Sequence, residues 1–233
     1  MAKFYGIGIG PGDSELVTIK AANTIKSLDI LYTPKAHNDS LSTAEKIVEP
    51  YISDKTEIKR RRFPMIKNLE EKQNAWNIVA EEIIADVKAG NNVGFVTLGD
   101  ASVYSTYTYL INIIGDQIPV ETIAGIASYT QIAAQLSIPL MIDEEMLEVL
   151  PAIAPMDKIS DAIDVNDNVV IMKISARVKE IHDMLTEKEL LDKAVLVQSA
   201  SMDEEKITPF SQIDPSKKLP YFSTLLIKKN YTF

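Results

Sequence analysis

The chain has 233 residues, of which 46% are hydrophobic, so it is long enough and apolar enough to bury the core of one large domain or of two smaller ones. Its formal net charge of −9 argues against general nucleic-acid binding, because phosphate backbones require a positive surface. It contains no cysteine, which excludes disulfides and cysteine-ligated metal sites and is typical of a cytoplasmic protein.

The first half of the chain alternates short apolar strands with helical segments. The expected strands are Phe4 to Ile9, Asp29 to Thr33, Thr56 to Arg61, Asn92 to Leu98 and Pro119 to Ile123. The expected helices are Asp13 or Ser14 to Ser27, Ser42 to Ile52, Leu69 to Ala89 and Val103 to Ile114. This alternation predicts an α/β domain with a mostly parallel sheet and helices on both faces.

The second half continues with elements of both kinds. The expected helices are Ser128 to Leu136 and Ala176 to Leu185, and the expected strands are Glu148 to Ile153, Val169 to Ile174, Ala194 to Ala200 and Phe222 to Lys228. We therefore predict two α/β domains, residues 1–120 and 121–233. No apolar segment approaches the ~20 residues of a membrane span, and no signal peptide is visible before Phe4, so we expect a cytoplasmic protein without a membrane partner.

Loops rich in small residues follow the expected strands of the first domain. Gly6 to Asp13 superficially resembles a dinucleotide-binding loop, but Pro11 lies inside the turn and Asp13 would repel a phosphate. These residues argue against nucleotide phosphate binding, and a turn without a ligand is the default interpretation of this loop taken alone. Asp100, at the end of a strand, could accept hydrogen bonds from ribose hydroxyls or from an ammonium group, or could cap the next helix.

Taken in order, these loops resemble those of the tetrapyrrole methylases. The matching motifs are Gly-x-Gly-Pro-Gly-Asp at residues 8–13, Gly-Asp-x-x-x-Tyr-Ser-Thr around Gly99, Asp100 and Tyr104 to Thr106, and Gly-Ile-x-Ser at residues 125–128. The chain departs from the family at Ala101 and Ala124, where proline is usual. The resemblance implies an enzyme with two α/β domains, a cofactor cleft between them, S-adenosyl-L-methionine as methyl donor, S-adenosyl-L-homocysteine as product, and a homodimer.

Cofactor contacts follow from the same resemblance, position by position. The residues expected to bind S-adenosyl-L-methionine are Pro11, Leu98, Gly99, Asp100, Val103, Ser105, Thr106, Ala127, Ser128, Met172, Lys173 and Ala200.

Further segments are similar to the C(20)-methyltransferases of corrinoid biosynthesis. They are Tyr32 to Lys35, Arg62 to Met65, Val170 to Lys173 and Pro220 to Ser223. This similarity implies methylation of carbon 20 of precorrin-2 or cobalt-factor II. The alternatives are another family member that acts on a different ring carbon, on ribosomal RNA or on diphthine, or a non-catalytic binding protein with this fold.

We expect Asp100, Lys173 and Tyr221 near the reacting centre, where they would orient the substrate or manage the lost proton. Lys173 interrupts an apolar strand, and burying an ammonium group is costly, although its side chain could reach the surface. Tyr221 could instead be an ordinary amphipathic core residue.

Basic residues are concentrated in one run, Lys59 to Arg62. This run is either a solvated strand end or a site for a polyacid, and Lys35, Arg60, Arg61 and Arg62 would then pair with the carboxylates of the tetrapyrrole. His182 is more typical of a structural histidine, whereas His37 could contact the substrate or a metal. No His/Cys cluster predicts a protein metal site.

Overall fold

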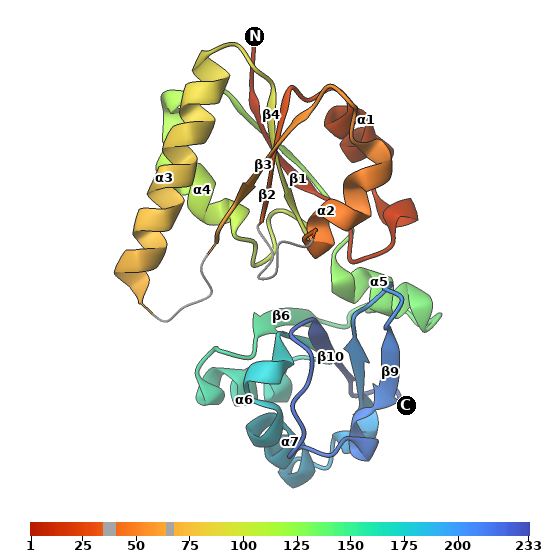
Figure 1. Cartoon of the computed structure of the whole chain (residues 1–233). Helices are drawn as coiled ribbons and strands as arrows, with labels where there is room; N and C mark the ends of the chain where they lie inside the picture. Colours follow the sequence, from red (N-terminus) through yellow and green to blue (C-terminus); the bar gives the residue numbers. More distant parts are fainter. Residues whose placement is uncertain (35–40, 64–67) are drawn as a thin grey trace. The chain divides into compact units, whose positions relative to one another are not determined.

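The computed structural model describes residues 1–34, 41–63 and 68–233. The chain divides into two compact units, Met1–Ala127 and Ser128–Phe233, each with its own five-stranded sheet (Figure 1). The fold class of two α/β units, predicted from the sequence, is confirmed. The division lies after the strand β5 (Val120–Ile123), whereas the sequence pattern placed it at residue 120.

The first sheet has the strand order β3-β2-β4-β1-β5, and neighbouring strands are parallel. Its other strands are β1 (Phe4–Gly8), β2 (Ile30–Pro34), β3 (Glu57–Arg61) and β4 (Val93–Thr97). Because all strands run in one direction, their carboxyl ends meet at one edge. Ligands of open parallel sheets bind at that edge, which makes it the first place to look for a site.

Helices cover both faces of this sheet, as the alternating pattern predicted (Figure 1). They are α1 (Ile19–Lys26), α2 (Thr43–Val48), α3 (Leu69–Lys88) and α4 (Tyr107–Ile114). Phe4 and Phe95 pack beneath α3 and α4, while Ile7 and Val96 pack beneath α1 and α2. Because successive side chains of a strand point to opposite faces of the sheet, each strand contributes to two separate cores.

Two helices begin later than the sequence pattern predicted. Asp13 caps only a short 3₁₀ helix, Ser14–Leu16, and Thr18 caps α1 by accepting a hydrogen bond from the Ala21 amide. A second cap so close to the first breaks the expected single helix in two. Similarly, α4 begins at Tyr107 rather than at Val103, because Tyr104 has a φ of 47° that no right-handed helix accommodates.

The second sheet is mixed, with the order β6-β7-β10-β8-β9. Its strands are β6 (Leu147–Pro151), β7 (Asn168–Met172), β8 (Ala194–Gln198), β9 (Lys206–Pro209) and β10 (Ser223–Lys228). The strands β6 and β7 are parallel, and β10 runs antiparallel to both β7 and β8. The antiparallel β10 brings its first residue to the edge at which β7 and β8 end.

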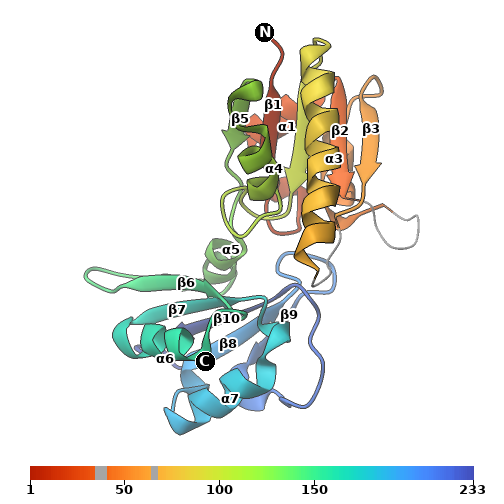
Figure 2. The ribbon, with the colours of Figure 1, turned by 90° about the vertical axis from the view of Figure 1, so that its left-hand side faces the viewer.

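Helices α6 (Met156–Val165) and α7 (Val178–Glu187) cover one face of the second sheet, and α5 (Ser128–Gln135) lies on the other (Figure 2). The sequence pattern did not predict α6 or β9. Ile159, Ala162 and Ile163 have helical spacing on the buried side of α6, but the aspartates around them resemble an acidic turn. The strand β9 has only four residues, two of them exposed.

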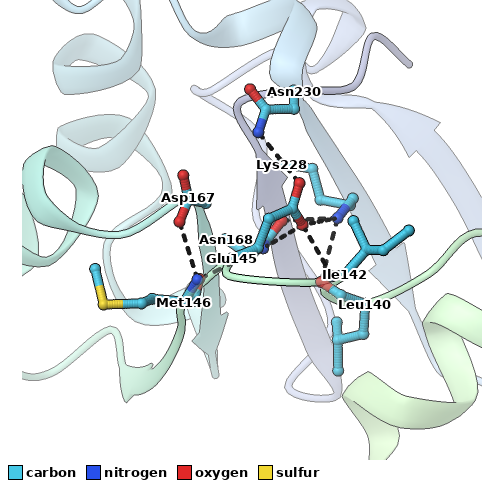
Figure 3. Close-up of polar contacts among 8 residues, drawn as sticks. All are labelled: Leu140, Ile142, Glu145, Met146, Asp167, Asn168, Lys228 and Asn230. Carbon is cyan, nitrogen blue, oxygen red and sulfur yellow. Dashed lines mark hydrogen bonds and ion pairs between the residues drawn. The ribbon is translucent and has the colours of Figure 1, made fainter.

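A buried lysine joins the segment before β6 to this sheet (Figure 3). Lys228 is 3% exposed, and its ammonium group donates to the Asn168 side-chain oxygen at 2.7 Å and to the Leu140 carbonyl at 3.2 Å. Glu145 lies 3.5 Å from the same nitrogen and accepts hydrogen bonds from Asn168 and Asn230. A charge this deeply buried requires such partners, so this cluster fixes the segment to the sheet.

Candidate active site

The loops after β1, β4 and β5 meet at the carboxyl edge of the first sheet. They comprise residues 9–13, 98–106 and 124–127. The Gly99 amide donates a 2.7 Å hydrogen bond to the Gly10 carbonyl, and the Gly10 amide donates one of 3.2 Å to the Gly99 carbonyl. This reciprocal pair joins the first two loops through main-chain atoms alone.

Gly8 and Gly125 bring the third loop against β1. A Cβ atom on Gly125 would lie 2.3 Å from the Gly99 oxygen and 2.6 Å from the Gly8 carbonyl carbon, and one on Gly8 would lie 2.6 Å from the Gly125 nitrogen. Side chains are therefore excluded at both positions. Gly6 has a comparable function, since its Cβ would lie 2.0 Å from the Tyr107 ring. Packing thus explains these glycines without a bound phosphate.

Asp100 ties the second loop to the third. One carboxylate oxygen accepts hydrogen bonds from the amide and the hydroxyl of Ser102, and the other accepts one of 2.9 Å from the Gly125 amide. Burial alone would raise the pKa of Asp100, but the hydrogen bonds from Ser102 and Gly125 together hold that pKa below its usual value. The carboxylate is thus ionised at neutral pH and retains capacity for a further donor.

Ser105 and not Asp100 satisfies the start of α4. The buried Ser105 hydroxyl accepts a 3.1 Å hydrogen bond from the Tyr107 amide and lies 2.8 Å from the Thr97 hydroxyl. The alternative in which Asp100 caps this helix is therefore wrong. The Asp100 carboxylate instead holds the loops that precede the helix.

The main chain at Gly99 leaves room for a small ligand at the edge of the first sheet. Gly99 has a φ of 71°, and a Cβ added there would meet no described atom within 4 Å, so space is open beside its backbone. In the second unit, the buried hydroxyls of Ser128 and Thr208 have no hydrogen-bond partner among the residues that the structure describes. Pro11 and Ala127 are also buried in the first unit, and Leu98, Val103 and Thr106 are partly exposed.

The remaining predicted residues gather at one edge of the second sheet. Met172 and Lys173 are at the end of β7, Ala200 follows β8, and Tyr221 precedes β10. The Lys173 ammonium lies 6.0 Å from the centre of the Tyr221 ring. The structure thus brings the two proposed catalytic side chains of the second unit together.

Lys173 does not interrupt a strand, and that prediction is wrong. The strand β7 ends at Met172, and Lys173 adopts a left-handed conformation with φ 58° and ψ 38° that starts a 3₁₀ turn. Burial lowers the pKa of the Lys173 ammonium and raises the pKa of the Tyr221 hydroxyl.

Ser199 and Ser201, which flank Ala200, also have left-handed φ values of 50° and 56°. Residues other than glycine rarely adopt this conformation, and such strain is concentrated at functional sites. Nothing in the sequence predicted this conformation, because serine carries no signal for a positive φ.

The basic run is largely paired within the first unit. Arg60 donates to the buried Glu45, Arg61 to Glu82 and Lys59 to Asp86. Arg62 is exposed beyond the end of β3.

Lys35 and His37 lie outside the described residues. The His182 ring packs 5.4 Å from that of Phe210, as expected of a structural histidine. Within residues 1–34, 41–63 and 68–233, no group of three or more His, Cys, Asp or Glu could hold a metal ion. No helix in that part of the chain has the length and apolar composition needed to cross a membrane.

Comparisons with known proteins agree with the motifs in these loops. The chain is 36% identical to the cobalt-precorrin-2 C(20)-methyltransferase of Salmonella typhimurium, over 99% of this chain and 98% of that protein. It is 31% identical to the probable cobalt-precorrin-2 C(20)-methyltransferase of Methanocaldococcus jannaschii, over 97% and 96% of the two chains. The structure of the Thermus thermophilus uroporphyrin-III C-methyltransferase complexed with S-adenyl homocysteine superposes with a TM-score of 0.70 at 14% identity, covering 98% of this chain and 92% of that one.

A sequence model of the tetrapyrrole (corrin/porphyrin) methylases matches residues 3–213. The resemblance found in the loop motifs is therefore confirmed, and the chain belongs to the tetrapyrrole methylase family.

Proposed function

We propose that the protein is a methyltransferase that methylates carbon 20 of precorrin-2 or cobalt-factor II in cobalamin biosynthesis. The observation that carries the proposal is the 36% identity to the Salmonella typhimurium enzyme along 99% of this chain. Fold similarity alone would not distinguish one ring carbon from another, since one fold hosts many activities.

S-adenosyl-L-methionine is the proposed methyl donor, and S-adenosyl-L-homocysteine the proposed product. Support comes from the ligand of the Thermus thermophilus structure and from the main-chain surface beside Gly99. When bound, the donor supplies an electrophilic sulfonium methyl group. Its proposed contacts in the first unit are Pro11, Leu98, Gly99, Asp100, Val103, Ser105, Thr106 and Ala127. Those in the second unit are Ser128, Met172, Lys173 and Ala200.

The chain's own residues would align the reactants and manage one proton. A carbon–carbon bond forms at carbon 20, the methyl–sulfur bond breaks, and the proton on carbon 20 leaves. Asp100 connects the loops after β4 and β5 and can accept a further hydrogen bond. Together with Asp100, Lys173 and the neighbouring Tyr221 are the proposed groups that orient the substrate or manage the leaving proton, for which the ionised Asp100 carboxylate is an available acceptor.

An assay with a methyl-labelled donor tests the activity. The protein is incubated with precorrin-2, with cobalt-factor II and with both in competition. We expect label at carbon 20 of at least one substrate, and the competition identifies the preferred one. Label at a different carbon would assign the chain to another activity of the family, and donor binding without transfer would make it a binding protein.

A matched pair of glycine variants tests the cofactor site. Gly99 and Gly90 both have a positive φ, and an added Cβ would meet no described atom within 4 Å at either position. Gly99→Ala and Gly90→Ala should each lose about 1–2 kcal/mol of stability through backbone strain. Only Gly99→Ala should weaken donor binding measured by calorimetry, because only Gly99 belongs to the proposed site. Equal donor affinity in the two variants would remove Gly99 from that site.

Assembly and compartment are further parts of the proposal. We propose a homodimer, as the family resemblance implies. The absence of cysteine supports a cytoplasmic location, and the net charge of −9 argues against nucleic-acid binding. Light scattering coupled to gel filtration measures the mass against the 25.9 kDa of one chain, and a monomer would contradict the dimer.

A further inference from the structure

The run Lys59–Arg62 holds four consecutive cations, and three of them are bound to carboxylates of neighbouring helices. On the side of the sheet that faces α3, the Lys59 Nζ lies 2.8 Å from the Asp86 Oδ2, and the Arg61 Nε lies 2.6 Å from the Glu82 Oε2. Both carboxylates belong to α3. These pairs fasten the edge strand β3 to the helix.

Arg60 points to the opposite side and is held more tightly. Its Nη2 donates at 2.6 Å and its Nε at 3.0 Å to the two carboxylate oxygens of Glu45, a residue of α2 whose side chain is 3% exposed. The buried Thr33 hydroxyl donates to the same carboxylate at 3.0 Å. Releasing Arg60 would leave a buried charge without its partner, so this guanidinium is committed to the fold.

Arg62 differs from the other three cations. It is exposed, and it forms no hydrogen bond or ion pair with any residue that the structure describes. Both of its neighbours are nevertheless held on the side of the sheet that faces α3. Arg61 forms an ion pair with Glu82, and the centre of the Phe63 ring lies 5.2 Å from the centre of the Phe95 ring. The backbone of Arg62 is therefore held while its guanidinium stays available, which lowers the entropic cost of binding an anion.

The position of Arg62 suits a large ligand of the candidate site. It follows the last residue of β3, at the edge where the loops after β4 and β1 meet. Two strand spacings separate β3 from β4, so Arg62 lies roughly 10 Å to the side of the loop that contains Gly99. A guanidinium group binds a carboxylate through two parallel hydrogen bonds.

We propose that Arg62 is the member of this run that binds a carboxylate side chain of the tetrapyrrole, while Lys59, Arg60 and Arg61 hold β3 in place. This inference rests on the proposed function, since it takes a tetrapyrrole as the substrate. The sequence alone suggested several basic residues as partners of the tetrapyrrole carboxylates, and the ion pairs of β3 leave Arg62 as the candidate within this run.

Steady-state kinetics of Arg62→Gln test the assignment. We expect the KM for the tetrapyrrole to rise roughly ten- to hundredfold, the effect of losing one charge-assisted pair. The kcat and the donor affinity should stay at the wild-type values, because Arg62 lies roughly 10 Å to the side of the proposed donor loop that contains Gly99. Arg62→Lys should give an intermediate KM, since lysine keeps the charge but not the paired hydrogen bonds.

Lys88→Gln is the matched control. Lys88 is an exposed cation of the same unit at the end of α3, before β4 begins, and its loss removes the same charge away from the carboxyl edge. An unchanged KM in Arg62→Gln overturns the proposal, as does an equal rise in Lys88→Gln, which would indicate a general effect of net charge.

Substrate binding without the donor separates this inference from the proposed function. Binding of precorrin-2 or cobalt-factor II is followed by quenching of Trp76 fluorescence. Wild-type binding without methyl transfer contradicts the activity but leaves Arg62 testable: weaker binding by Arg62→Gln supports its assignment, and equal binding overturns it. Absence of binding by the wild type overturns both.

Discussion

At the scale of single residues, Asp100 shows how one side chain connects two loops. Its carboxylate accepts hydrogen bonds from Ser102 and from the Gly125 amide, so the loops after β4 and β5 depend on the same group. Asp100→Asn should lower the free energy of unfolding by about 1–3 kcal/mol, because the amide NH2 group would face the Gly125 or Ser102 N–H, which needs an acceptor. Donor affinity should fall with it. Urea unfolding and calorimetry at neutral pH measure the two effects.

Ser102→Ala provides the control for this residue. It removes the exposed hydroxyl that donates to Asp100 and leaves the bond to Gly125 intact. We expect it to cost less stability than Asp100→Asn. A loss as large as that of Asp100→Asn would show that the link to the third loop contributes little.

At the scale of elements, the segment before β6 depends on Glu145. Hydrogen bonds from Asn168 and Asn230, together with the charge of Lys228, lower the pKa of Glu145 from 4.5 to about 2. A lowered pKa stabilises the folded state above pH 4.5, and this contribution disappears as the pH falls towards 2. Glu145→Gln should therefore be less stable than the wild type at pH 7, and the difference should shrink between pH 4.5 and 2.

Urea unfolding followed by circular dichroism measures this dependence. The exposed Glu204→Gln is the control, and its difference from the wild type should be small at both ends of the range. A Glu145→Gln difference that is constant from pH 7 to pH 2 would contradict the proposed stabilisation by the Glu145 charge.

Elements with strong periodicity could be predicted, and those set by local backbone conformation could not. The parallel sheet followed from apolar strands alternating with helices, and α3 was predicted to within one residue because Trp76, Val79, Ile83 and Val87 keep helical spacing. The start of α1 was missed because the cap at Thr18 divides the expected helix, and the start of α4 was missed because Tyr104 has a positive φ.

The candidate site was predictable to the same extent. The order of the glycine loops was visible in the sequence, but the ion pairs of Arg60 and Arg61 were not, because their partners Glu45 and Glu82 come from distant helices. The left-handed conformation of Lys173 left no trace in the sequence either.

At the scale of the whole molecule, each unit has its own core, and the only tryptophan, Trp76, belongs to the first. Its ring stacks 4.0 Å from that of Tyr109, between α3 and α4. S-adenosyl-L-methionine at a hundred times its dissociation constant should stabilise the unit that binds it by about 2.7 kcal/mol. We therefore expect the donor to shift the unfolding transition reported by Trp76 fluorescence. An unchanged Trp76 transition at saturating donor would contradict binding by the loops of the first unit.

The charged character of β3 also affects how the protein behaves at high concentration. β3 is an outermost strand, and such strands expose unpaired amide and carbonyl groups that can recruit a strand from another molecule. The edge strand β3 carries the charged residues Lys59, Arg60 and Arg61. The other edge strands, β5, β6 and β9, carry Glu121, Glu148 and Lys206, respectively. Neutralising the basic run would thus remove a barrier against intermolecular β-sheet growth and favour aggregation.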